Sequence, residues 1–94
     1  MTTVTVGATA TEVAAADGNR GDLTIQHVDV AQGTVRVWLA PSASVAVGAA
    51  MVLTGVGVSL AVAGSRAAVA WYAIAEEAGV VVAVETGSKW DTQT

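Results

Sequence analysis

Hydrophobic and polar residues alternate with a period of two along several short stretches of the chain. This alternation is typical of a β-strand with one buried face, because successive side chains of a strand point to opposite sides. The stretches with the clearest alternation are residues 23–30, 35–39, 56–62 and 80–85. In residues 35–39 the aliphatic side chains share one face, whereas Arg36 and Trp38 lie on the other.

Weaker strand patterns occupy much of the remaining chain. Residues 2–6 alternate Thr and Val, residues 9–14 form a second extended run, and residues 66–75 form a strand that includes Trp71. Residues 45–53 are ambiguous, because their alanines would allow a short helix that their glycine disfavours.

Turn residues separate these strands. Asp-Gly-Asn at 17–19 and Ala-Gly-Ser at 63–65 predict turns. Pro41 ends the strand before it, since proline has no N–H to donate to a ladder. About seven short strands at roughly 8–12-residue spacing, with no long helical pattern between them, predict an all-β fold. We expect a small antiparallel β-sandwich, or a partly closed barrel.

The predicted core and domain bounds follow from this pattern. The core residues are expected to be Leu23, Ile25, Val35, Val37, Leu39, Trp71, Ile74, Val82 and Val84, with Val56, Val58, Leu60 and Val62 buried as well. We expect one domain over residues 1–94, with an extended N-terminal arm at 1–8 and a C-terminal tail at 87–94. Both ends are expected to become ordered on contact with a partner, since free termini are usually disordered.

Composition narrows the classes of function. The chain has 94 residues, of which 53% are hydrophobic and only 13% charged, with a net charge of −4 and no cysteine. Such a small domain without disulfides often depends on contacts with other subunits. The basic residues are few and scattered, whereas a nucleic-acid backbone requires clustered Lys and Arg. We therefore expect an assembly component that binds no nucleic acid.

The segment 43–64 is uncharged and mostly apolar, which makes it long enough to cross a bilayer as a helix. A small membrane protein is therefore an alternative. The four glycines of the segment and its period-two alternation after Gly55 favour a strand instead. We expect the segment to lie within the β-fold and the protein to have no membrane partner.

Candidate catalytic chemistry is sparse. His27 is the single histidine, and no nucleophile motif accompanies it. Residues 17–22 resemble a calcium loop but lack the ligands at the fifth and last positions. We therefore expect no enzyme activity, no cofactor and no metal.

Two groups of residues resemble a known family. The first is Arg20-Gly21-Asp22-Leu23-Thr24-Ile25-Gln26 with the strand at 33–39, and the second is Trp71-Tyr72-Ala73-Ile74-Ala75 with the strand at 79–85. Together they resemble small bacteriophage virion proteins with the pattern R-x-x-L-T-I-Q-N followed by W/L-Y-A-I-A. His27 occupies the position that is often Asn in that family, and Arg20 is expected to bond turn carbonyls or a facing carboxylate.

The resemblance implies a capsid decoration (cement) protein on the outer surface of the phage head, made in the bacterial host cytoplasm. Its implied partners are the major capsid protein and further copies of itself, such as a trimer. A tail, collar or fibre module is an alternative within the virion, and a free carbohydrate- or protein-binding sandwich is another. The interface candidates are Trp90, Trp38, Arg36 and Arg20, because Trp and Arg are enriched at interface hot spots.

Overall fold

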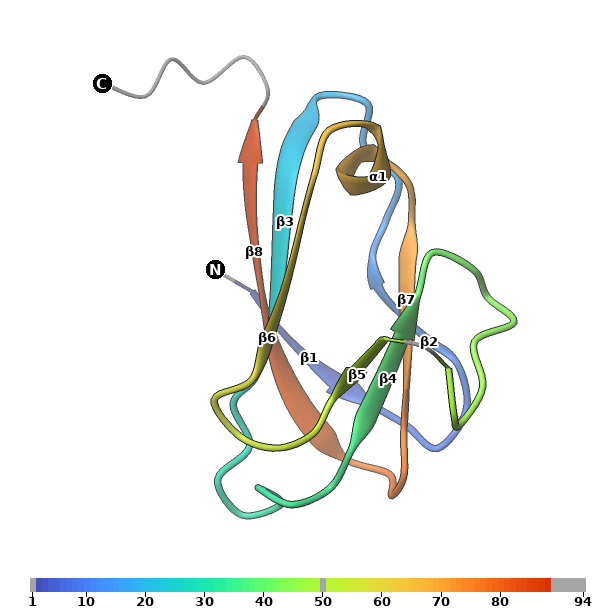
Figure 1. The fold of residues 1–94 in the computed structure, drawn as a ribbon, viewed down its shortest axis with the longest axis vertical. Coiled ribbons are helices and arrows are strands. Elements are labelled where there is room, and N and C mark those ends of the chain that lie inside the picture. The colour runs from blue at the N-terminus through green and yellow to red at the C-terminus, as the bar shows by residue number, and fades with distance from the viewer. Residues whose placement is uncertain (1, 50, 89–94) are drawn as a thin grey trace.

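The computed structural model describes residues 2–49 and 51–88, which form two packed β-sheets (Figure 1). The elements of the described residues are β1 (Thr2–Val6), β2 (Thr11–Ala14), β3 (Arg20–His27), β4 (Val37–Ala40), β5 (Met51–Leu53), β6 (Ser59–Ala63), α1 (Ser65–Ala68), β7 (Trp71–Ala75) and β8 (Val80–Ser88). Sheet A has the strand order β1-β8-β3-β6, and sheet B has the order β2-β7-β4-β5. All neighbouring strands are antiparallel. The predicted all-β sandwich is confirmed, and the two separate sheets do not close into a barrel.

The core lies between the sheets and is built by the predicted alternation. In β3, Leu23, Ile25 and His27 point inward, and from the neighbouring β8 the valines at 80, 82 and 84 join them. Sheet B contributes Val37, Leu39 and the fully buried Trp71 among others. Eight of the nine predicted core residues are buried, and Ile74 is the exception.

The prediction for Ile74 is wrong because of the strand parity of β7. Trp71, Ala73 and Ala75 are buried, whereas Ile74 between them is only half-buried on the outer face. Trp71 occupies the interior, so every second residue after it must also point inward. The small alanines leave space for the opposite sheet, and the larger Ile74 is directed outward.

The middle of the chain is less buried than predicted. Residues 43–49 lie in a loop, and residues 51–64 contain the short strand β5, a turn and the edge strand β6. Leu60 and Val62 point toward the core and are half-buried, but Val56 is 45% and Val58 37% exposed. These two valines precede β6, Val56 in a turn that contains Gly57 at φ +90° and Val58 directly after it, so neither follows the inward alternation of a strand. No helix in the described part of the chain is long and apolar enough to cross a membrane.

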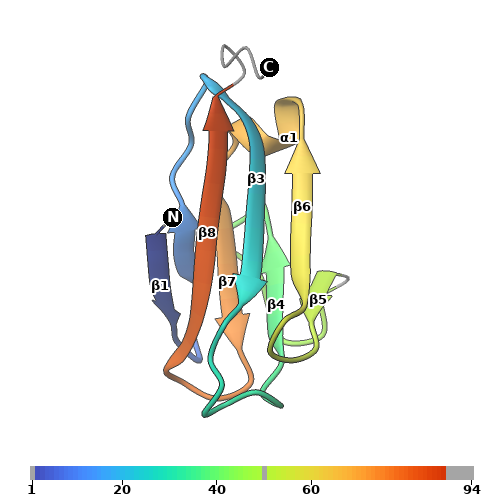
Figure 2. The same ribbon diagram turned by 90° about the vertical axis from the view of Figure 1, so that its left-hand side faces the viewer.

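Two further boundaries differ from the predictions. Residues 2–6 are not a free arm, because β1 pairs with β8 from Thr2 opposite Val84 to Val6 opposite Val80. Residues 65–68 form the helical turn α1, so the predicted strand at 66–75 begins only at Trp71. Figure 2 shows β8 lying between β1 and β3 in sheet A. The predicted tail contributes its first two residues to β8, and residues 89–94 lie outside the described part of the chain.

Candidate interaction surface

The outer face of sheet B gathers large apolar side chains on the side away from the core. Trp38 of β4 lies between Ile74 of β7 and Val52 of β5, and Tyr72 of β7 lies opposite Ala40. We call Trp38, Val52, Tyr72 and Ile74 the outer patch. Ile74, Val52 and Tyr72 are half-buried, so part of each remains accessible. Such a cluster of aromatic and aliphatic side chains resembles the core of a protein interface.

Trp38 forms the buried centre of this patch. Its side chain is on the predicted outward face, yet the residue is only 5% exposed and does not belong to the main core cluster. Val45, in the loop between β4 and β5, is also buried outside that cluster. Figure 1 shows this loop on the side of sheet B that faces away from sheet A. Trp38 therefore forms the buried base of the patch, while the accessible atoms belong to Val52, Tyr72 and Ile74.

An ion pair borders the patch at one end. The Arg36 guanidinium donates to the Glu76 carboxylate at 2.7 Å and lies over the Trp38 ring, 5.3 Å from its centroid. The backbone supports this geometry, since the Glu76 N–H donates to the Arg36 carbonyl at 2.9 Å. The side-chain hydrogen bond from Arg36 lowers the pKa of Glu76, and the same bond raises the pKa of Arg36. Arg36 and Trp38, both predicted interface residues, are thus brought together.

A second polar contact borders the patch near β2. The Tyr72 hydroxyl donates to the Glu12 carboxylate at 3.3 Å, across the β2–β7 pair. The outer patch therefore has an apolar centre and charged groups at two sides. This arrangement can bind an apolar protein surface that carries complementary polar groups at its rim. The low exposure of Trp38 argues against its use as an open stacking platform for a sugar.

Arg20, the third predicted interface residue, is instead buried inside the domain. It is 6% exposed and donates to three backbone carbonyls, from Nε to Ala67, from Nη1 to Ala15 at 2.9 Å and from Nη2 to Val69 at 2.8 Å. The expectation that Arg20 bonds turn carbonyls is confirmed. Its guanidinium connects β3 of sheet A to the segment that leads into β7 of sheet B.

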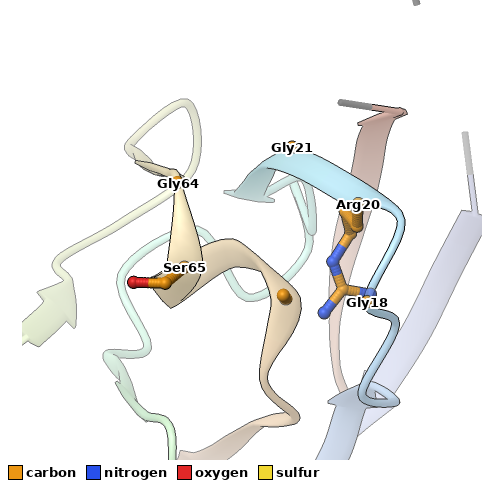
Figure 3. A pocket seen from close by; sticks show the side chains of 6 residues that line it. Gly18, Arg20, Gly21, Gly64 and Ser65 are labelled. Atoms are coloured by element: carbon orange, nitrogen blue, oxygen red, sulfur yellow. The ribbon is translucent and has the colours of Figure 1, made fainter. Parts of the chain in front are cut away.

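An open depression of about 320 Å³ lies beside Arg20. Its lining is largely backbone and small side chains, with Gly64 and Ser65 across from Arg20 and Gly21 (Figure 3). The Arg20 guanidinium already has three carbonyl partners, so it offers little to a ligand. The depression therefore has few of the convergent polar groups expected of a ligand site.

His27 is fully buried and satisfied by the backbone. Its Nδ1 accepts from the Asp29 N–H at 3.3 Å, so its Nε2 donates to the Val35 carbonyl at 2.9 Å. The predicted local hydrogen-bonding role is confirmed. Within residues 2–49 and 51–88, no group of three or more His, Cys, Asp or Glu side chains could hold a metal ion. In the loop that resembles a calcium site, the Asp17 carboxylate accepts the Asn19 N–H at 2.9 Å.

Two carboxylates make stability depend on pH. A hydrogen bond from the Val81 N–H to Asp29 at 3.2 Å lowers the pKa of Asp29, as Arg36 lowers that of Glu76. Each pKa is lower in the folded chain than in the unfolded chain. Their stabilisation is thus present above the unfolded values and is lost as the pH falls through the folded values.

We therefore expect the melting temperature to fall as the pH drops below about 4, the ordinary range of carboxyl groups. Glu76→Gln should lower the melting temperature at neutral pH and should reduce its dependence on pH. Thermal unfolding followed by circular dichroism between neutral and acidic pH measures both effects. Glu77→Gln, at the exposed neighbouring position, is the matched control. Identical pH profiles for Glu76→Gln and the unmodified protein would contradict the prediction.

Sequence reasoning missed three residues of the outer patch. Val52 lies in the segment whose pattern is ambiguous, the pattern alone gives Tyr72 no face, and its hydrophobicity predicts Ile74 in the core. Strand parity counted from Trp71 would have directed both Tyr72 and Ile74 outward. Trp90, the fourth predicted interface residue, lies outside the described residues. The chain matches no protein-family model, no curated protein sequence and no solved structure.

Proposed function

We propose that the protein is a structural, non-enzymatic capsid decoration protein of a bacteriophage. In this role it binds the outer surface of the head and stabilises contacts between major capsid subunits. The observation that carries the proposal is the outer patch, an apolar face with a charged rim on a small β-sandwich. A decoration protein binds by burying surface against the capsid and needs no catalytic group. An apolar patch with a charged rim can form such a contact.

The resemblance to phage virion proteins supports this proposal in structural terms. The first group of residues lies in β3 and β4 and the second in β7 and β8, which are the inner strands of sheets A and B. Arg20 begins the first group and bonds the carbonyls of Ala67 and Val69, which precede the second group. The shared pattern thus corresponds to elements that hold the two sheets together, as expected when a fold rather than a catalytic site is retained.

Binding through sheet B can be tested with heads from which the protein has been removed. The unmodified protein should co-sediment with such heads, and Ile74→Asp should weaken the binding at least tenfold. The physical reason is that a carboxylate in the centre of an apolar interface loses its hydration without gaining a partner. Circular dichroism of each variant establishes that the fold is intact.

The matched control is Gln26→Asp, which places the same charge at a half-buried position on the outer face of sheet A, opposite the uncharged Ala83 and Ser59. This variant should bind heads as the unmodified protein does. Equal binding by Ile74→Asp and the unmodified protein would rule out sheet B as the attachment face. Binding to purified tails and not to heads would favour the tail, collar or fibre alternative. Binding to neither would overturn a virion role.

A further inference from the structure

The two sheets differ in how their edge strands are protected. In sheet B, edge strand β2 contains a register shift between Glu12 and Ala14, and edge strand β5 is short, with three described residues. Bulges, charges and short length all hinder pairing with another strand. In sheet A, edge strand β6 has five residues, Ser-Leu-Ala-Val-Ala, with no charge, proline or glycine. The β6 edge is therefore open to a further strand.

The hydrogen-bond pattern shows which groups of β6 are available. The Gly64 N–H donates to the Gly21 carbonyl, and the Val58 carbonyl accepts the His27 N–H, each at 3.0 Å. The even-numbered residues of the segment 58–64, which includes β6, therefore direct their backbone groups toward β3. Because backbone groups alternate in direction along a strand, the odd-numbered residues Ser59, Ala61 and Ala63 direct theirs to the open edge.

The core is also incompletely covered on this side. Leu60 and Val62 of β6 and Met51 of β5 are apolar residues that pack against the core but remain partly exposed. Val58, just before β6, is 37% exposed. A strand added beside β6 would remove part of this apolar surface from water, which stabilises the added contact.

We propose that β6 pairs with β6 of a second copy of this chain, antiparallel about a twofold axis at Ala61. The register then places Ser59 opposite Ala63 of the second copy, and Ala61 opposite its own equivalent. These are the positions whose N–H and C=O groups face the open edge. Leu60 lies opposite Val62 of the second copy, so the partly exposed core residues cover one another. Sheet A becomes a continuous eight-stranded sheet across the dimer.

A second copy is the occupant that the sequence of this edge favours. Residues 52–64 carry no charge, so two copies of a chain with a net charge of −4 can meet here without like charges in the ladder. The strand is also self-complementary, since small residues meet small ones and branched apolar residues meet each other. The opposite edge, β1, is uncharged too, but three of its five residues are threonine. The proposal is independent of any binding to a phage head.

Disulfide trapping tests the register. The natural chain has no cysteine, so a single introduced cysteine reports one contact. Directly opposed residues of a hydrogen-bonded antiparallel pair have Cα atoms about 5.5 Å apart, within the disulfide range. Ala61→Cys should therefore form a disulfide-linked dimer under mild oxidation, seen on non-reducing gels. Thr5→Cys on the β1 edge is the matched control and should stay mostly unlinked.

Removal of an edge donor tests the same contact without a cross-link. Proline is tolerated on an edge strand where its missing N–H would face solvent. Ala61→Pro should convert the dimer to a monomer, whereas Thr5→Pro should leave the dimer unchanged. The Val81 carbonyl of β8 accepts the N–H of Val28, which directly follows β3, so the backbone groups of Val81 face away from β1. Thr5, opposite Val81, therefore points its own backbone groups to the open edge, which makes it the appropriate control. Analytical ultracentrifugation measures the mass, with twice 9.3 kDa expected for the unmodified protein.

Several results would overturn the proposal. A monomer at all concentrations, together with no cross-link for Ala61→Cys, excludes the dimer. Cross-linking of Thr5→Cys alone assigns the contact to β1. A trimer, or a cross-link formed only between Ala61→Cys and Thr5→Cys chains in a mixture, indicates head-to-tail pairing of β6 with β1. If Ala61→Pro does not fold, the cysteine experiment still decides the question.

Discussion

Replacement of Trp71 by alanine is expected to lower the free energy of unfolding by about 3–5 kcal/mol. Trp71 is fully buried and is the largest side chain of the core. Its indole N–H also donates to the Arg66 carbonyl at 2.8 Å, so the substitution both opens a cavity and removes a donor. Since domains of this size are stable by only about 5–15 kcal/mol, a large part of the stability should be lost. Urea unfolding followed by circular dichroism measures the change.

Trp71→Phe separates the two contributions. Phenylalanine retains much of the ring but has no N–H, so the loss should be clearly smaller than that of Trp71→Ala. Ile74→Ala, at the half-buried outward position of the same strand, should also cost less. A melting temperature for Trp71→Ala close to that of the unmodified protein would show that Trp71 does not fill the core.

Replacement of Arg20 by alanine is expected to cost about 3 kcal/mol or more, because hydrogen bonds to charged groups contribute roughly 1.5–3 kcal/mol each. Arg20 makes three such bonds, to the carbonyls of Ala15, Ala67 and Val69. Without the guanidinium these carbonyls lose a partner at a position that is 6% exposed. The same unfolding measurement applies, and Arg20→Lys should recover only part of the loss, since one ammonium lacks the planar fork of a guanidinium.

Arg66→Ala is the matched control for Arg20. Arg66 lies in α1, near the same end of the sandwich, but it is exposed. Surface substitutions of this kind usually change stability by no more than about 0.5 kcal/mol. Equal stability of the Arg20→Ala and Arg66→Ala variants would contradict the role of Arg20 as a connection between the sheets.

Much of the fold could be predicted from local alternation. β3, β4 and β8 have clear periods of two, and most of their inward residues are predicted from the sequence; the exceptions are His27 and Val80, which are buried but are not in the predicted core. The prediction for β7 is wrong because the hydrophobicity of Ile74 favours burial, whereas the alternation of side chains counted from Trp71 directs Ile74 to the outer face. Ile74 is more apolar than Ala73, but a strand that buries Trp71 cannot bury both Ala73 and Ile74. Once one residue of a strand is known to be buried, the alternation of side chains decides the face of every other residue more strongly than hydrophobicity does.

Other features depend on contacts that no local pattern specifies. The sequence predicts that β1 is extended, but only the long-range pairing with β8 decides that it is part of a sheet and not a free arm. Likewise, the alternation before β6 does not reveal that Val56 and Val58 precede the strand at an open edge. The outer patch combines residues from β4, β5 and β7, so its composition follows from the strand order of sheet B.

The position of β8 has a consequence for how the chain folds during its synthesis. Among the described strands, β8 is synthesised after the other strands of both sheets, yet it lies between β1 and β3 and is the described strand that pairs with β1. β1 therefore remains unpaired until β8 has been made, and sheet A can close only after the residues up to Ser88 have emerged. Contacts between residues so distant in sequence slow folding, because a long loop must close before they form. Until then β1 and one side of β3 remain unpaired, so the nascent chain exposes strand edges that the finished sheet conceals.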